Sequence, residues 1–185
     1  MRRWTSFSED WQEDVGSVAV ESADGLLHFD PLDPPERADH TFITVFFHAR
    51  GARGRIWAPA RQVKRLANRG VEVTDPFEPG DELPGGVECF TTAREGEVVY
   101  WVPSERALIV GDVLLGAGAK PRKTDDPLRL CPDRWVGGGK TQADLAASLR
   151  PLLELPIEQV LVSHGAPVLA DGRAHLTAVL DTVVS

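Results

Sequence analysis

The feature of this sequence that most constrains its fold is a short, fully apolar run that ends in a single carboxylate. The run is Ala107–Val110. Four consecutive apolar residues are too few for a helix, and they predict a buried strand that Gly111 stops. Asp112 then lies at the carboxyl end of the strand. In layered α/β folds, side chains at strand ends project into the mouth of the fold, where ligands and metals are usually held. Asp112 is therefore a candidate site residue.

A second segment of the chain ends in a similar way. Ile157–Ser163 is predicted to form a strand, and His164 and Gly165 follow it directly. Imidazole and carboxylate groups are both common metal ligands. The sequence thus contains two predicted strands that each end in a potential metal ligand, Asp112 and His164.

Length and composition indicate a single globular domain over residues 1–185. A chain of this size buries roughly 70% of its unfolded surface, and its content of 42% hydrophobic residues is ordinary for a soluble protein. The two cysteines, Cys89 and Cys131, form neither a disulfide framework nor a C-x-x-C pair. We find no apolar signal segment and no run of about 20 apolar residues. These features predict a cytoplasmic protein that does not cross a membrane.

The charge distribution disfavours binding to nucleic acid. The net charge is −8, which makes binding to anionic polymers or anionic membranes unfavourable over most of the surface. One segment is basic, with seven cations and no acid, but Trp57 is its only aromatic residue available for base stacking, so nucleic acid is not the expected partner. Its cations are Arg50, Arg53, Arg55, Arg61, Lys64, Arg65 and Arg69.

The first half of the chain predicts a hairpin followed by a βαβ unit. Strands at 18–21 and 26–30 flank the Asp24-Gly25 turn signal. Thr41–Phe47 predicts a third strand that ends at His48. After a loop, Pro59 begins a short helix over 60–68, and 71–74 forms the next strand. A strand, helix and strand in this order imply parallel pairing.

The second half predicts more strands and two helices. Segments 87–92 and 97–102 are expected to be antiparallel strands, whereas 117–139 is mostly connection that could cover a site. Thr141 and Asp144 resemble a capping box that opens a helix to Leu153. Asp171 is expected to cap a last helix that ends near Val184.

Three motifs in this order resemble the metallo-β-lactamase superfamily. They are L-L-H-F-D-P-L at 26–32, I-V-G-D-V-L at 109–114 and V-L-V-S-H-G-A-P-V at 160–168. The likeness extends from about Val18 to the carboxyl terminus. It implies a four-layer αββα sandwich, an α/β (α+β) fold, with the site at the edge where the two sheets meet.

The resemblance also implies metal ligands, most of which are missing here. The family's His-x-His-x-Asp-His motif corresponds to His48–Arg53, in which only His48 is retained and Arg50, Ala52 and Arg53 take the other three positions. The later histidine should fall within Thr91–Gly96, where none is present. Asp112 and His164 match the bridging Asp and the last His. The implied metal ligands are thus His48, Asp112 and His164.

These departures leave three hypotheses and the question of enzyme activity open. Because arginine neither binds a metal nor accepts a proton, the leading hypothesis is a divergent protein without a cofactor. It is inactive, or it binds a small anion through Arg50, Arg53, Asp112 and His164. Alternatively, these arginines only pair with acids such as Asp112 or Asp30.

The second hypothesis is a zinc-dependent hydrolase of ester, thioester or lactam type that uses a reduced site of one zinc ion. Its ligands would be His48, Asp112 and His164. The third is a structural or partner-binding domain with Trp4, Trp11 and the 75–86 loop as contact surface. The oligomeric state stays open, with a homodimer among the alternatives.

Overall fold

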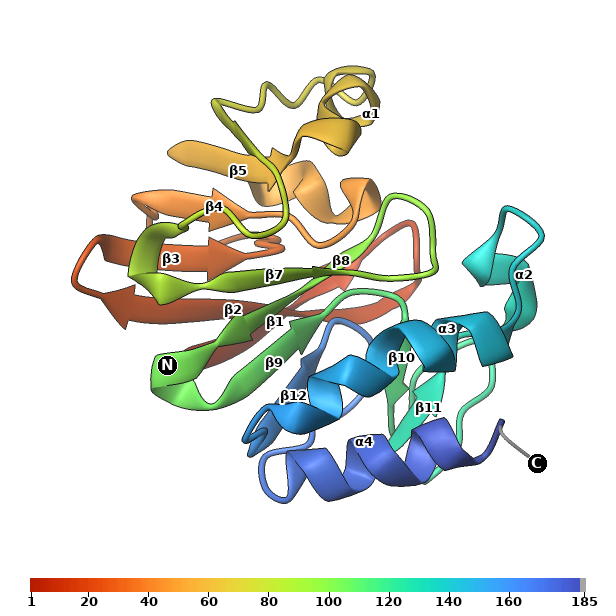
Figure 1. Ribbon diagram of the computed structural model, residues 1–185. Coiled ribbons are helices and arrows are strands. Elements are labelled where there is room, and N and C mark those ends of the chain that lie inside the picture. The colour runs from red at the N-terminus through yellow and green to blue at the C-terminus, as the bar shows by residue number, and fades with distance from the viewer. Residues whose placement is uncertain (184–185) are drawn as a thin grey trace.

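The computed structural model describes residues 1–183, apart from the side chain of Arg50. Its larger sheet contains six strands in chain order (Figure 1). The first three strands are antiparallel and the remaining neighbours pair in parallel. The strands are β1 (Arg2–Ser8), β2 (Glu13–Ser22), β3 (Gly25–Phe29), β4 (His40–Phe42), β5 (Arg55–Pro59) and β6 (Asp75–Phe77).

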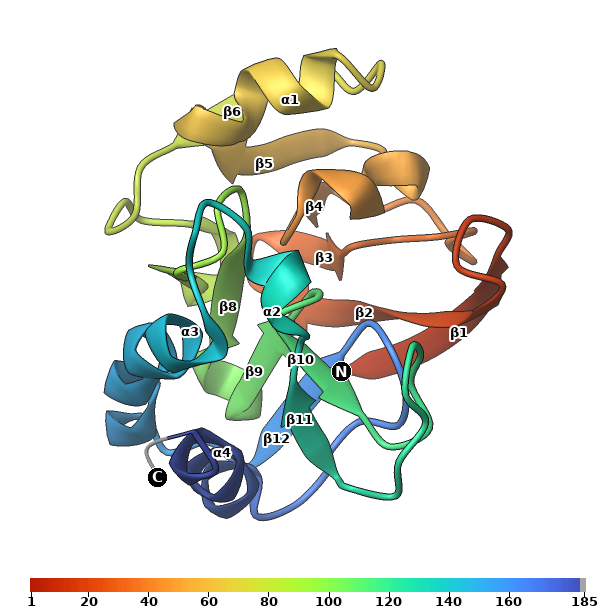
Figure 2. The ribbon, with the colours of Figure 1, turned by 90° about the vertical axis from the view of Figure 1, so that its right-hand side faces the viewer.

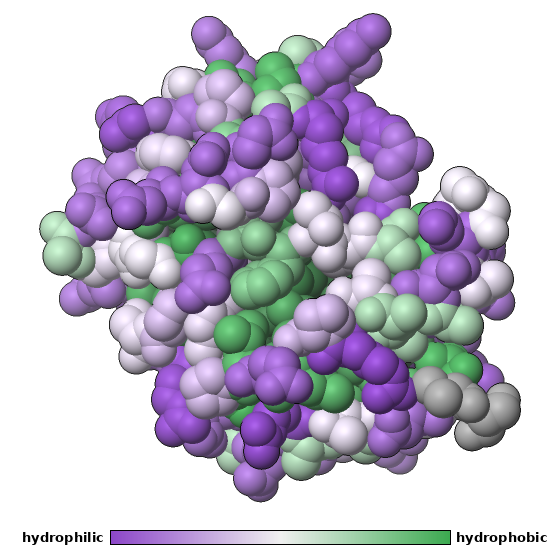
Figure 3. Space-filling view, viewed as in Figure 1, coloured by the Kyte–Doolittle hydropathy of each residue, from purple (hydrophilic) through white to green (hydrophobic). Residues whose placement is uncertain are grey.

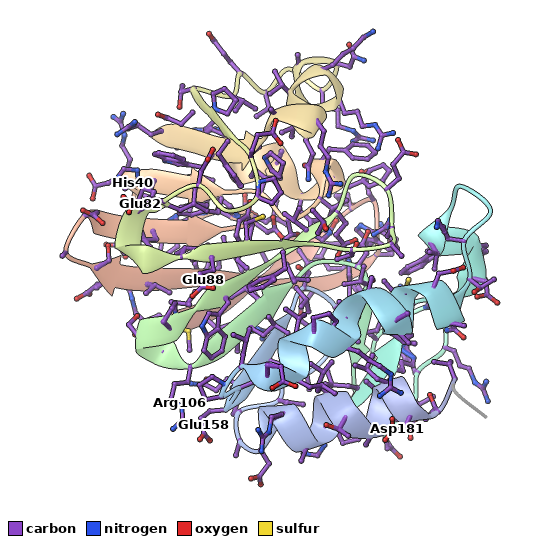
Figure 4. The ribbon with its side chains drawn as sticks, in the orientation of Figure 1. His40, Glu82, Glu88, Arg106, Glu158 and Asp181 are labelled. Atoms are coloured by element: carbon purple, nitrogen blue, oxygen red, sulfur yellow. The ribbon has the colours of Figure 1, made fainter. Side chains whose placement is uncertain are left out.

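A second sheet of four strands faces the first, in the order β12-β9-β8-β7. These strands are β7 (Glu88–Thr91), β8 (Val98–Val102), β9 (Ala107–Val110) and β12 (Gln159–Val162). β9 and β12 are parallel and begin side by side, where Arg106 and Glu158 form a salt bridge of 2.9 Å (Figure 4). A separate antiparallel pair, β10 (Leu114–Gly116) and β11 (Leu128–Leu130), lies beyond β12 (Figure 2).

Helices cover the outer faces of the two sheets. Short 3-10 helices join several elements: η1 (Phe46–Gly51), η2 (Ala60–Gln62), η3 (Pro84–Gly86), η4 (Pro103–Glu105) and η5 (Arg150–Glu154). The α-helices are α1 (Val63–Ala67), α2 (Asp133–Val136), α3 (Gln142–Leu149) and α4 (Gly172–Asp181). None of the helices in the described part of the chain is long and apolar enough to cross a membrane.

The buried hydrophobic residues form three clusters, two of which lie on opposite faces of the second sheet. In β8, Val98, Tyr100 and Val102 face the larger sheet, whereas Val99 and Trp101 face α3 and α4. A third cluster joins Ile56 and Ala58 of β5 to Leu66 of α1. The order of layers is therefore helix, sheet, sheet and helices, which confirms the αββα sandwich.

Hydrophilic residues cover most of the face in Figure 3, with hydrophobic residues gathered in a hollow between β7 and α3.

The local predictions were correct for the central elements and wrong near His48. The hairpin, the 87–92 and 97–102 strands, the strand at 107–110 and the capping box of Thr141 and Asp144 are confirmed. The strand predicted over 41–47 stops at Phe42, and His48 lies in η1. Beyond the end of β4, the carboxylate of Asp30, 14 residues earlier in the chain, accepts the Thr44 N–H at 2.8 Å, so this N–H is not available to a strand ladder.

Other boundaries also differ. The segment before Pro59, predicted to be a loop, forms β5, and the strand predicted at 71–74 is replaced by β6. A parallel strand–helix–strand unit is present, but it runs from β5 through α1 to β6, so the strands predicted at 41–47 and 71–74 do not pair with each other. Residues 117–139 contain β11 and α2 in addition to connections. Asp171 does precede α4, but its side chain makes no capping hydrogen bond.

Candidate metal centre

Three side chains from distant parts of the chain converge at one edge of the sandwich: His48, Asp112 and His164. One ligand atom from each lies within 4.8 Å of the others. Asp112 and His164 are neighbours because β9 and β12 pair in parallel with Val110 beside Val162, and each candidate ligand follows two residues later. His48 reaches them from η1, next to the larger sheet. The sheets thus bring together the three metal ligands implied by the sequence.

Two glycines allow this close approach. A Cβ on Gly111 would lie 2.5 Å from Thr44 Oγ1 and 2.9 Å from Glu97 Oε1. Gly165 has a φ of 85°, and a Cβ there would lie 2.5 Å from the Gly116 carbonyl oxygen. Larger side chains at these positions would push Asp112 and His164 away from their neighbours.

Each histidine is oriented by a second carboxylate. His48 Nδ1 lies 3.1 Å from Asp30 Oδ2, and His164 Nδ1 lies 3.0 Å from Glu13 Oε1. Their Nε2 atoms consequently point to the same oxygen, Asp112 Oδ1, at 3.2 and 3.1 Å. Sequence reasoning did not identify Glu13 as a site residue, and it considered Asp30 only as a partner for arginine.

The carboxylates control the protonation of the two imidazoles. Burial lowers the pKa of His48, but the negative charges of Asp112 and Asp30 outweigh burial and raise this pKa well above its ordinary value. Burial likewise opposes protonation of His164, whose pKa is raised by hydrogen bonds to Asp112 and Glu13. Burial favours the neutral form of Asp112, yet these imidazoles and a nearby arginine hold its pKa well below the usual range.

That arginine is Arg94, which the sequence analysis did not identify. It lies between β7 and β8, in the segment where the missing histidine was expected. Its Nη1 donates to Asp112 Oδ2 at 2.6 Å and also pairs with Glu97, while its Nε donates to the Trp135 carbonyl oxygen at 2.8 Å. Burial raises the pKa of Glu97 to about 7, with Asp112 adding to the shift and Arg94 opposing it.

Arg53, one of the two arginines that the sequence analysis placed at the site, does not contact Asp112 as Arg94 does. Arg53 is exposed, and its Nη1 donates to the Ala52 carbonyl oxygen at 2.8 Å. Its own carbonyl accepts a hydrogen bond from Thr41, in the middle of β4, whereas the site lies beyond the end of that strand. The structure therefore does not bring Arg53 to Asp112 and His164. The side chain of Arg50 lies outside the described residues.

A small cleft opens beside His48. Only about 30 Å³ is open to water, which is room for roughly one water molecule. The Trp11 ring lies 4.6 Å from the His164 ring and 5.3 Å from the Trp135 ring, so α2 helps to cover the site, as 117–139 was predicted to do. The lining residues are Ser8, Trp11, Val15, Gly16, Asp30, Leu32, Phe47, His48 and Ser163.

The donor set fits one divalent metal ion. Two imidazoles and a carboxylate are a ligand combination that zinc accepts. His48 Nε2 is buried and, despite its 3.2 Å distance from Asp112 Oδ1, has no hydrogen bond of acceptable geometry. It is thus a free nitrogen directed at the position that a metal would share with Asp112 Oδ1. The other oxygen of Asp112 is taken by Arg94.

Comparisons with known proteins identify the fold. No family model matches the sequence, and no curated protein matches it. Among solved structures, the DIM-1 metallo-β-lactamase is similar with a TM-score of 0.66 and 14% identity, over 97% of this chain and 91% of that one. The mono-zinc form of the metallo-β-lactamase FIM-1 from Pseudomonas aeruginosa is similar with a TM-score of 0.63 and 13% identity, over 97% of this chain and 88% of that one. TTHA1623 in a di-iron-bound form is similar with a TM-score of 0.61 and 17% identity, over 95% of this chain and 98% of that one. The protein therefore has the metallo-β-lactamase fold.

Proposed function

We propose that this protein binds one divalent transition-metal ion, of the zinc type, through His48, Asp112 and His164. We further propose that this reduced site serves the hydrolysis of a small ester, thioester or lactam. The observation that carries the proposal is the orientation of the two imidazoles, each held by a carboxylate at Nδ1 and directed through Nε2 to Asp112. A carboxylate behind a ligating histidine fixes the ring and raises its basicity, and this arrangement is typical of protein metal sites.

A zinc ion held in this way supplies Lewis acidity and can lower the pKa of a coordinated water to about 7. The chain's own residues have supporting roles. Asp30 and Glu13 fix the rings of His48 and His164. Arg94 offsets part of the negative charge of Asp112 and Glu97 on the side away from the histidines. Trp11 limits the access of water to His164.

A second candidate function is that of an inactive relative. It is favoured by the small volume of the cleft, which leaves a substrate no room unless Trp11 or Phe47 moves. Anion binding in this cleft gains less support. Among the described lining residues of the cleft, the ionisable side chains are the acid Asp30 and His48, which is already paired with it, so this part of the lining offers no free cation.

Metal content separates these candidates. The purified protein is incubated with zinc, freed of excess metal and measured by elemental analysis. We expect about one equivalent in the wild type and a loss of this metal in His164→Ala. His175→Ala, which removes a histidine from α4 outside the site, is the matched control and should keep the metal.

Protein that holds zinc is then tested with chromogenic ester, thioester and lactam substrates. A wild type without zinc, or equal zinc in His164→Ala, would reject the metal site. Zinc binding without turnover of any substrate would favour the inactive relative.

A further inference from the structure

A second and much larger cavity lies away from the candidate metal centre, between the β10–β11 pair and α4. Its volume is about 700 Å³, within the range of small-molecule pockets. We call it the basic groove, and in Figure 2 the elements that form it lie at the lower edge. It shares no lining residue with the cleft beside His48. Its walls are Leu115, Pro121, Arg122, Thr124, Asp126–Pro132 apart from Cys131, Arg134, Gln142, His175, Ala178, Val179, Thr182 and Val183.

The charge of the basic groove is opposite to that of the chain. Arg122, Arg129 and Arg134 line it against a single acid, Asp126, whereas the whole protein has a net charge of −8. Within residues 1–183, none of the three arginines forms a salt bridge. Three arginines against one acid leave an excess of positive charge in a concave region, even though Asp126 and Glu13 lie close enough to act on Arg129, and this excess favours an anionic ligand.

Two polar atoms in the wall of the groove lack partners. Arg129 Nη2 donates to the Ala119 carbonyl oxygen, but its Nη1 is buried without a hydrogen bond, and so is Thr124 Oγ1. Buried polar groups in native proteins are normally satisfied, so unpaired donors call for water or a ligand. Because both residues line the groove, small rotations of their side chains would present these donors to an anion seated there.

The opposite wall of the groove is partly apolar, through Ala178, Val179 and Val183. His175, Ala178, Val179, Thr182 and Val183 recur at the spacing of one helical face, along α4 and just beyond it. Leu128 and Leu130 of β11 lie in the facing wall. A ligand that fits both features carries a charged head and a short apolar part.

We propose that the basic groove binds a small organic anion, whose carboxylate or phosphate group is held by Arg122, Arg129 and Arg134 and whose apolar part packs along α4. The inference is independent of metal binding, because no residue of the candidate metal centre takes part.

Isothermal titration of the full, metal-free chain tests the proposal with three probes: hexanoate, inorganic phosphate and hexanol. We expect hexanoate, phosphate or both to bind with a Kd below about 1 mM, and hexanol to bind at least tenfold more weakly than hexanoate. Binding of phosphate alone would identify a phosphate site, and binding of hexanoate a carboxylate site. The affinity should be the same in His164→Ala, which keeps this test separate from that of the metal site.

Substitutions then locate the binding. Arg129→Met and Arg122→Met should each weaken binding about tenfold or more, as loss of a charge-assisted hydrogen bond predicts. Arg122 is exposed, so its variant stays informative if Arg129→Met loosens the loop held by its contact with Ala119. Arg173→Met removes an exposed arginine of α4 that does not line the groove and should bind normally. The proposal is wrong if neither anion binds, if hexanol binds as tightly as a bound hexanoate, or if the arginine variants bind like wild type.

Discussion

The two carboxylate oxygens of Asp112 face different chemical environments. Oδ1 faces two imidazoles, His48 and His164, whose charge depends on protons or on a bound metal. Oδ2 faces the guanidinium of Arg94, which stays charged at any relevant pH. One oxygen of Asp112 therefore faces groups whose charge can change, and the other faces a fixed cation.

The largest effect is expected from removing the fixed cation. Arg94→Met leaves Glu97 and Asp112, both fully buried, without their shared partner. Loss of one partner of a buried ion pair typically costs about 3–5 kcal/mol, and we expect a decrease of that size in the free energy of unfolding, measured by urea denaturation. Arg65→Met breaks the exposed pair with Glu95 and should cost less than about 1 kcal/mol. Equal effects of the two substitutions would show that Arg94 has no special role.

A smaller effect, on zinc affinity, is expected on the side of Asp112 that faces the two histidines. Glu13→Gln weakens the contact that orients His164, and loss of such a support typically lowers metal affinity about 10- to 100-fold. Zinc affinity can be measured by competition with a chromogenic chelator. Glu9→Gln makes the same charge change on the same hairpin, where the Glu9 carboxylate accepts a hydrogen bond from the Gln12 side chain and is no part of the candidate metal centre; this variant should bind zinc normally. If Glu13→Gln also binds normally, the proposed orientation of His164 is incorrect.

The third effect concerns the pH dependence of stability that Glu97, a partner of the fixed cation Arg94, produces. Glu97 has a pKa raised from 4.5 to about 7, mainly by burial. An acid with a higher pKa in the folded chain binds its proton more tightly there, so its contribution to stability is present at low pH and decreases as the pH rises from about 4.5 to 7. Glu97→Gln should remove this dependence, which amounts to at most about 1.4 kcal/mol per pH unit. Parallel stability curves for the two proteins would contradict the raised pKa.

The sequence was most informative where chemistry and local structure coincide. Asp112 and His164 each lie two residues after the end of a short apolar strand, so their place at the edge of the sheet could be predicted before their spatial contact was known. The sandwich was implied by the family resemblance that the three motifs carry. His48 does lie beside Asp112 and His164, although the segment expected to be its strand ends in a 3-10 helix.

The remaining site residues depend on long-range pairing that has no local signal. Arg94 acquires its role only because the turn between β7 and β8 lies against Asp112, 18 residues away in the chain. Glu13 begins β2, whose pairing with β1 was not predicted because the first residues are polar and acidic. The position of β5 was missed for a similar reason: glycines and arginines interrupt its segment, and its neighbours β4 and β6 define it. Candidate ligands at strand ends are thus easier to predict than the residues that surround them.

Arg94 also affects how the protein should respond to a shortage of metal. Many small metalloproteins unfold when a chelator removes their ion, because nothing else neutralises the ligands. Here a covalently attached cation remains beside Asp112 and Glu97 after chelation, and protonated imidazoles can balance the other oxygen. Treatment with EDTA should therefore leave a folded chain that is ready to take up metal again, and circular dichroism before and after chelation would reveal any loss of structure.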